Sequence, residues 1–277
     1  MTHTARQLGH RSLYHWQRFN PDAPALKHVE RLEAFLRSGK LFCSSPSAFN
    51  DPWDCKPHFN TELLNDAREL QRHADWAVEI TNRRAPMSVC DTEAMRRRLL
   101  ADIPFAVGLL EEMSVALGVA IAEKYRVYCL GPTPSNTLMW SHYADDHKGI
   151  CLEYSVDNDV FCCALECEYL EEFPMLRPYD VTEEEDLRVL LAKSDVWRYE
   201  NEFRLIVEER AHAPATSSAL LADDCMLQLP QGALTGIIVG CQGPLDTVRG
   251  IVESVAPHVR VRRATRVPNR YELHIET

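Results

Sequence analysis

The stretch Trp197-Arg198-Tyr199-Glu200-Asn201-Glu202-Phe203-Arg204-Leu205-Ile206-Val207 alternates almost regularly between apolar and charged side chains. Side chains of a β-strand repeat every two residues, so this pattern predicts a strand over residues 197–207. Its polar face carries Arg198, Glu200, Glu202 and Arg204. Two interpretations stay open for this face. It is either a solvated surface on which each glutamate is relieved by an arginine, or a pair of carboxylates pointed into a cleft between flanking arginines.

Further strands are expected on both sides of this segment. The apolar runs that predict them are 12–16, 40–44, 125–130, 149–154, 160–169, 226–229, 234–239, 259–261 and 271–275. Helical spacing of apolar residues appears at 29–36, near 137–146, near 182–194 and after Pro244, with Gly39 suited to end the first of these helices.

A largely helical block separates the early strands from the later ones. It covers residues from about 61 to 124, with Asp91 or Thr92 as a helix N-cap and Pro104 breaking or kinking the second helix. The sequence therefore predicts an α+β fold: a mixed, mainly antiparallel sheet core with this inserted helical block and a C-terminal strand–helix–strand unit. We expect one domain over residues 1–277, with the block as an insertion or cap.

Composition narrows the classes of partner. The chain has 277 residues, 45% of them hydrophobic and 26% charged, with a formal net charge of -11. Such an acidic protein repels phosphates, so no general nucleic-acid binding is expected. The first residues lack an apolar leader, and the longest uncharged runs are shorter than a bilayer span, which favours a cytoplasmic protein away from membranes. Ten scattered cysteines, lacking paired metal-ligand spacing, read as free thiols.

Four separated segments resemble the bacterial domain-of-unknown-function 2971 family. They are Leu13-Tyr14-His15-Trp16, Ser38 to Asp54, Leu138 to Gly149, and Trp197 to Arg204. Their order and spacing agree with the family along the whole chain, and the block at about 61–124 is the least similar part. The resemblance implies a fold but little about activity, since no activity is assigned to the family.

Two of these segments carry candidate site residues. On a helix over Leu138–Gly149, His142 and Tyr143 share a face with Asp146, which could fix the tautomer of His142. A histidine there serves either packing or chemistry. Asn50 and Asp51 precede Pro52 and predict a rigid turn, which is either purely structural or a platform for a polar side chain that meets a ligand.

The order of three motifs is similar to that in ADP-ribosyltransferases: Tyr14-His15-Trp16, then Ser44-Ser45, then Glu200-x-Glu202. That similarity implies NAD as substrate. Glu202 would steady the ribosyl cation and Glu200 would orient the acceptor. Substrate-binding residues would be His15 and Tyr14 at the ribose, Ser44 supporting the pocket, Trp140 or Tyr143 against nicotinamide, and Asn50, Asp51 and Arg204 around them. No metal is expected, and the acceptor and the oligomeric state stay open.

Two other functions fit the same residues. A metal-assisted hydrolase or nuclease could use Asp51, His142, Asp146, Glu200 and Glu202. A ligand-sensing or interaction module without chemistry is the third possibility. The enzyme interpretation, including a role in a toxin or phage-defence system, requires the first strand, the Asn50-Asp51 turn, the His142 helix and the Glu200/Glu202 segment to meet around one cleft.

Overall fold

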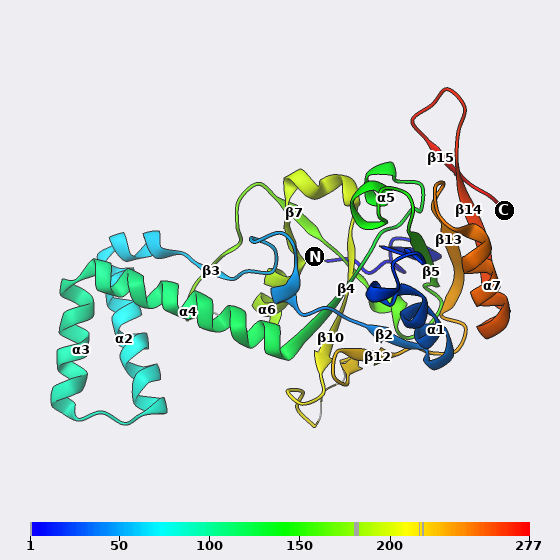
Figure 1. The fold of residues 1–277 in the computed structure, drawn as a ribbon. Coiled ribbons are helices and arrows are strands. Elements are labelled where there is room, and N and C mark those ends of the chain that lie inside the picture. The colour runs from blue at the N-terminus through cyan, green and yellow to red at the C-terminus, as the bar shows by residue number, and fades with distance from the viewer. Residues whose placement is uncertain (1, 180–182, 216, 218) are drawn as a thin grey trace. The chain divides into compact units, whose positions relative to one another are not determined.

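The computed structural model describes residues 2–179, 183–215, 217 and 219–277. The chain divides into two compact units (Figure 1). Unit 1 comprises Met1–Ser45, Lys124–Tyr169 and Asp195–Thr277, and unit 2 comprises Pro46–Glu123 and Leu170–Ser194. Helices account for 41% and strands for 24% of the structure, arranged in mixed sheets, which confirms the α+β prediction. Whether the units amount to one domain with an insertion stays a prediction.

A five-stranded sheet forms one layer of unit 1. Its strand order is β1 (Ser12–Gln17), β5 (Ile150–Ser155), β13 (Leu234–Val239), β14 (Arg260–Arg266) and β15 (Leu273–Ile275). Neighbours are antiparallel except β13 and β14, which are parallel and joined by α7 (Leu245–Val255). A parallel pair needs such a crossover, and the predicted C-terminal strand–helix–strand unit is confirmed.

A second sheet of unit 1 is built around β10 (Phe203–Glu209). This strand lies between β4 (Tyr125–Leu130) and β11 (Leu221–Ala222), and it also pairs with β6 (Leu165–Glu166). A two-stranded ribbon joins β2 (Lys40–Phe42) to β12 (Met226–Gln228). One continuous core takes apolar side chains from both sheets and from helices α1 (His28–Ser38) and α7. The other face of the five-stranded sheet packs on α5 (Thr137–Tyr143) through a smaller cluster that contains Trp16 and Trp140.

Two expected strands are wrong over part of their length. Residues Asp195–Glu200 form the 3-10 helix η5, and the strand begins only at Phe203. Between them Asn201 has a φ of 45°, a left-handed conformation that asparagine tolerates and a strand cannot contain. Glu200 and Glu202 therefore do not share one extended segment. Similarly, the segment expected as a strand at 160–169 opens with the 3-10 helix η4 (Phe161–Cys163) before the short strands β6 and β7 (Glu168–Leu170).

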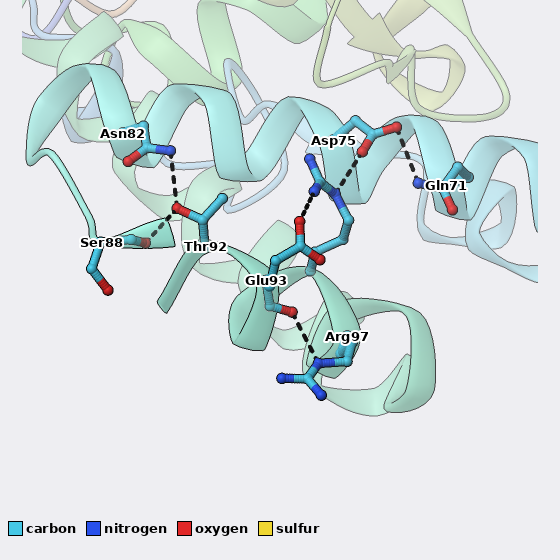
Figure 2. Close-up of polar contacts among 8 residues, drawn as sticks. Gln71, Asp75, Asn82, Ser88, Thr92, Glu93 and Arg97 are labelled. Atoms are coloured by element: carbon cyan, nitrogen blue, oxygen red, sulfur yellow. Dashed lines mark hydrogen bonds and ion pairs between the residues drawn. The ribbon is translucent and has the colours of Figure 1, made fainter. Parts of the chain in front are cut away.

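Unit 2 contains most of the helical block. Helices α2 (Ala67–Arg84) and α3 (Val89–Ala101) lie side by side, and α4 (Ile103–Lys124) follows and runs on into β4 of unit 1. In Figure 2 the Asn82 amide donates to the Thr92 hydroxyl at 3.4 Å, and Gln71 donates to Asp75 at 3.1 Å. Ser88, whose hydroxyl accepts the Asp91 N–H at 3.1 Å, is the N-cap of α3, so the expected cap at Asp91 or Thr92 is wrong. Pro104 is the second residue of α4, where no N–H partner is required.

The remaining elements are short. Unit 2 also holds η2 (Pro46–Ala48), η3 (Thr61–Asn65), α6 (Glu183–Leu191) and β9 (Ala192–Ser194), and it pairs β3 (His58–Phe59) with β8 (Met175–Leu176) in parallel. Unit 1 also holds η1 (Pro24–Leu26). Of the helix expected at 182–194, Thr182 lies outside the described residues.

Helix α4 is more apolar than the sequence argument from uncharged runs suggested. Among the described residues it is the one helix that is long and apolar enough to cross a membrane, judged by length and composition alone. Only 17% of its most apolar 18-residue stretch is buried. Glu111 and Glu112 interrupt the uncharged runs, which is why counting such runs missed it. The expectation of a protein without a membrane partner stays a prediction.

A strained turn follows α5. Asp145, Asp146 and His147 have φ values of 48°, 53° and 67°, so consecutive residues adopt the left-handed region that usually belongs to glycine. The predicted helix over 137–146 therefore ends early, at Tyr143. Against this turn lies Gly240, where an added Cβ would be 2.1 Å from the His147 carbonyl oxygen. Gly240 has no side chain, and this lets its backbone pack directly against the backbone of the turn at His147.

We expect Gly240→Ala to lower the free energy of unfolding by about 1–3 kcal/mol, because its methyl group meets backbone that cannot yield. Gly250→Ala is the matched control. Gly250 lies inside α7 with nothing within 4 Å of its added Cβ, so alanine should raise stability there by about 0.5–1 kcal/mol. Urea unfolding followed by circular dichroism measures both changes. Equal effects of the two substitutions would contradict the packing at Gly240.

Candidate functional site

The Glu200/Glu202 segment is buried rather than solvated. Relative exposure is 3% for Glu200, 2% for Glu202 and 0% for Arg204. Arg204 donates from Nε to Glu202 Oε1 at 3.0 Å and from Nη2 to Oε2 at 3.2 Å. This two-pronged geometry is the strongest form of an arginine–carboxylate contact. The interpretation of residues 198–204 as a solvated face is therefore wrong for these three side chains.

The two glutamates have different partners. Glu200 ends η5, and its Oε1 accepts a hydrogen bond of 2.8 Å from the Tyr143 hydroxyl at the end of α5. Glu202 faces Arg204 instead, and its backbone N–H donates to the Tyr169 hydroxyl at 2.8 Å. The guanidinium of Arg204 offsets the negative charge of Glu202, and Glu200 accepts its hydrogen bond from the neutral hydroxyl of Tyr143.

The first strand approaches η5 through Gly131. Tyr14 exchanges two backbone hydrogen bonds with Gly131, at 2.9 and 2.8 Å. A Cβ on Gly131 would lie 2.9 Å from the Trp16 ring and 3.6 Å from the Glu200 carbonyl oxygen. The bare backbone of Gly131 thus lets β1 and the end of η5 come together. Asn136 ties α5 to the same place, because its amide donates to the Tyr199 carbonyl oxygen at 2.7 Å.

Tyr14 and His15 point to opposite faces of β1. The Tyr14 hydroxyl donates to Glu153 Oε1 at 3.1 Å, and Arg262 donates to Oε2 of the same carboxylate. Burial, followed by the Glu153 charge, raises the pKa of Tyr14 to about 12. Gly236 leaves room for this network, since its Cβ would lie 2.7 Å from Glu153 Oε2. The Tyr14 hydroxyl is therefore engaged within the protein.

His15 lies on the side of the second sheet. Its Nδ1 is 2.8 Å from the Cys129 carbonyl oxygen, and its ring stacks on Tyr128 at 4.2 Å between centroids. A carbonyl oxygen can only accept, so Nδ1 carries the proton and Nε2 is left as an acceptor. Cys129 lies on β4, where it pairs with Arg204 of β10. His15 and the Glu202–Arg204 pair therefore both lie beside β4 at Cys129.

Burial lowers the pKa of His15 from 6.5 to about 4. Above pH 6.5 the ring is neutral in both the folded and the unfolded chain. As the pH falls from 6.5 to 4, the unfolded chain takes up the proton first, so folding loses stability across that window. We expect this loss to be about 1–2 kcal/mol greater in the natural chain than in His15→Asn, which keeps a donor near Nδ1. Urea unfolding at pH 7.5 and pH 5 measures it, and identical pH dependence of the two proteins would contradict a buried neutral ring.

The other predicted site residues lie elsewhere or are already occupied. Trp140 is fully buried within the cluster between α5 and the five-stranded sheet, and its indole nitrogen donates to the Pro134 carbonyl oxygen at 2.6 Å. His142 is exposed, with its ring 6.2 Å from that of Tyr199. Since α5 ends at Tyr143, Asp146 is not one helical turn beyond His142, and the expected tautomer-fixing geometry is wrong. Ser44 is half-buried and bridges to Val127 through its backbone.

Asn50 and Asp51 belong to unit 2. Asn50 is exposed, while Asp51 is 9% exposed and accepts the Trp53 N–H at 2.9 Å. This is the side-chain-to-backbone bond that the structural interpretation of the turn predicts. Of the four segments expected to meet, unit 1 brings together the first strand, α5 and the Glu200/Glu202 segment.

Sequence reasoning missed several residues that build this region, among them Gly131, Asn136, Glu153 and Arg262. Asn136 could have been found, because an asparagine directly before a helical pattern is a common N-cap, and its side chain accepts the Leu138 N–H at 3.1 Å. Glu153 is a lone charge in an apolar strand, and Arg262 is one of four arginines in β14, so no local pattern singles out either residue. Within the described residues, no group of three or more His, Cys, Asp or Glu side chains could hold a metal ion.

Comparison of the chain with protein-family models, with curated proteins and with solved structures finds no match. The family resemblance and the similarity of motif order to ADP-ribosyltransferases therefore stay predictions. The residues of unit 1 carry the functional interpretation on their own.

Proposed function

We propose that this chain is an NAD-consuming enzyme of the ADP-ribosyltransferase type, which cleaves the bond between nicotinamide and ribose and passes ADP-ribose to an acceptor or to water. The observation that carries the proposal is the buried Glu200 carboxylate, held at 2.8 Å by the Tyr143 hydroxyl beside the first strand. A toxin or phage-defence effector is the setting that suits such an activity.

The chemistry requires a fixed negative charge near the ribose. As nicotinamide leaves, positive charge develops on the ribose ring, and a carboxylate held nearby stabilises the transition state more than the ground state. A buried carboxylate does this better than a solvated one, because water screens it less. Glu200 meets this requirement in our proposal.

The roles assigned to the two glutamates from sequence are exchanged in this proposal. Glu202 was expected to steady the cation, but Arg204 already neutralises its carboxylate. Glu202 and Arg204 instead fix the start of β10 and hold Glu200 in place. Tyr143 orients the Glu200 carboxylate, and Nε2 of His15 is an acceptor for a ribose hydroxyl. His142 is exposed and in our proposal is the group that meets the acceptor.

Incubation of the purified chain with NAD⁺, followed by chromatography of nicotinamide, tests the proposal. We expect nicotinamide release that a metal chelator does not abolish. Metal-dependent cleavage of RNA or DNA without nicotinamide release would favour a hydrolase instead. Silence in both assays, together with a thermal shift on adding a metabolite, would indicate a sensing module and contradict the proposal.

A further inference from the structure

Two adjacent cysteines lie on a turn that is fixed at both ends. Cys162 and Cys163 belong to η4, and just before it Asn158 Oδ1 accepts the N–H groups of Val160 and Phe161, each at 2.9 Å. Phe161 is fully buried and stacks on Tyr154 at 4.3 Å between ring centroids. Directly after the turn, the Ala164 carbonyl oxygen accepts the Ala5 N–H at 2.9 Å. The backbone that carries both thiols is therefore held in place.

The two sulfur atoms are close together and reachable. Cys162 Sγ and Cys163 Sγ are 3.6 Å apart, and Cys163 Sγ is also 3.5 Å from the Asp159 carbonyl oxygen. Cys163 is exposed and Cys162 is half-buried. Both residues are free thiols. The zinc–thiolate bond, about 2.3 Å long, gives the scale of a bond to sulfur. If one atom bonded to both sulfurs at that length, a sulfur–sulfur distance of 3.6 Å would set the S–atom–S angle at about 100°.

We propose that Cys162 and Cys163 form a dithiol site for a soft, thiophilic electrophile that bonds to two sulfurs, namely a trivalent arsenical. A pyramidal arsenic atom accepts two sulfur ligands at an angle near that value. Because the turn is already ordered, binding costs little further ordering of the chain.

The reaction is a condensation without oxidation or reduction. Two As–S bonds form and the As=O bond of an organoarsenic oxide breaks. The oxygen leaves as water with the two thiol protons, and arsenic stays bound to the two sulfurs. Partial burial, followed by the hydrogen bond with Cys162, raises the pKa of Cys163 to about 11. The Cys163 thiol thus stays protonated near neutral pH, so its reactions with arsenic and with disulfides are both slower than those of a thiolate.

Other thiol ligands fit the site less well. Structural zinc requires four protein ligands, and within the residues that the structure describes no third or fourth His, Cys, Asp or Glu joins this pair as a metal-binding group. An ion that takes two sulfurs in a straight line would need them farther apart than 3.6 Å. The two thiols can by themselves bind an atom that needs two sulfur ligands at a bent angle.

Intact mass spectrometry with phenylarsine oxide as the probe tests the proposal. The full chain is reduced with a phosphine, freed of reductant, treated with one equivalent of probe and then challenged with excess glutathione, which removes arsenic held by a single sulfur. We expect one phenylarsenic group to remain per chain. Cys162→Ser and Cys163→Ser should each reduce the retained fraction at least tenfold.

Cys90→Ser is the matched control, because Cys90 is exposed and has no adjacent cysteine; it should retain the adduct. Digestion of the labelled natural chain gives a second readout that does not depend on any variant folding, and it should place the adduct on the peptide containing residues 162–163. Failure of the natural chain to keep the adduct, retention by either single variant, or an adduct on another peptide would each overturn the proposal.

Discussion

Arg204→Met should lower the free energy of unfolding by about 3–5 kcal/mol, because it leaves the Glu202 carboxylate buried without its arginine. Both side chains of the pair are at most 2% exposed. The backbone of Glu202 is held by Tyr169 and by Cys167, whose N–H donates to the Glu202 carbonyl oxygen at 2.9 Å, so the segment does not readily shift to expose the carboxylate. Loss of the arginine from a buried ion pair is among the few causes of so large a loss of stability.

A surface pair in the same unit gives the control for this prediction. Arg210 Nε lies 2.5 Å from Asp223 Oδ1, but their side chains are 57% and 67% exposed. Solvent screens such a pair, so Arg210→Met should cost about 0.5 kcal/mol or less.

The double variant Glu202→Leu with Arg204→Met separates the unpaired charge from lost packing. Removing both charges should recover most of the stability that Arg204→Met alone loses. Urea unfolding of the natural chain and the three variants gives all the values. A loss below about 1 kcal/mol for Arg204→Met, or no recovery in the double variant, would contradict a stabilising buried pair.

The parts of the fold that local sequence determines were predictable. The strand at 125–130 has the predicted bounds, because five of its six side chains are apolar or aromatic and Arg126 is its one charge. Gly39 ends α1 with a φ of 64°, as its lack of a Cβ predicts. The strand–helix–strand order at the C-terminus followed from a largely apolar strand and a helical repeat after Pro244, which is the N-cap of α7.

The errors have one physical origin, which is that side-chain alternation does not fix the backbone. Residues 197–200 alternate as a strand does, yet they belong to the 3-10 helix η5, and Asn201 takes a left-handed conformation where the chain turns. The spacing of Asp146 likewise fits the face of the preceding helix, yet Asp145, Asp146 and His147 take left-handed conformations and the helix ends at Tyr143.

The sequence singled out Glu200, Glu202 and Tyr143, but it did not indicate which of the two glutamates contacts Tyr143 and which contacts Arg204. The pairing of Tyr143 with Glu200 joins positions 57 residues apart, and no local pattern indicates which of two nearby acids meets a tyrosine and which meets an arginine. The Tyr14–Glu153–Arg262 network depends on the order of β1, β5, β13 and β14 in the sheet. Such contacts depend on topology, which the sequence alone left undetermined.

Glu200→Gln should reduce the rate of nicotinamide release by about 100- to 1,000-fold, the cost of removing one preorganised charge from a transition state. Glutamine keeps the shape of the side chain and can still accept from the Tyr143 hydroxyl, so the fold should be retained. The missing element is the negative charge itself. If Glu200 carries the chemistry, kcat falls while the KM for NAD⁺ changes little, because the charge acts mainly in the transition state.

Comparison of kcat for nicotinamide release between Glu200→Gln and Glu202→Gln is the most direct test, with the thermal unfolding of each variant recorded beside it. We expect Glu200→Gln to melt near the natural chain and to lose at least about 100-fold in kcat. Glu202→Gln should melt lower, because Arg204 loses its charged partner, and should lose less than tenfold in kcat. A Glu200→Gln enzyme as fast as the natural chain, or a Glu202→Gln enzyme that is stable but inactive, would contradict the assignment of the catalytic charge to Glu200.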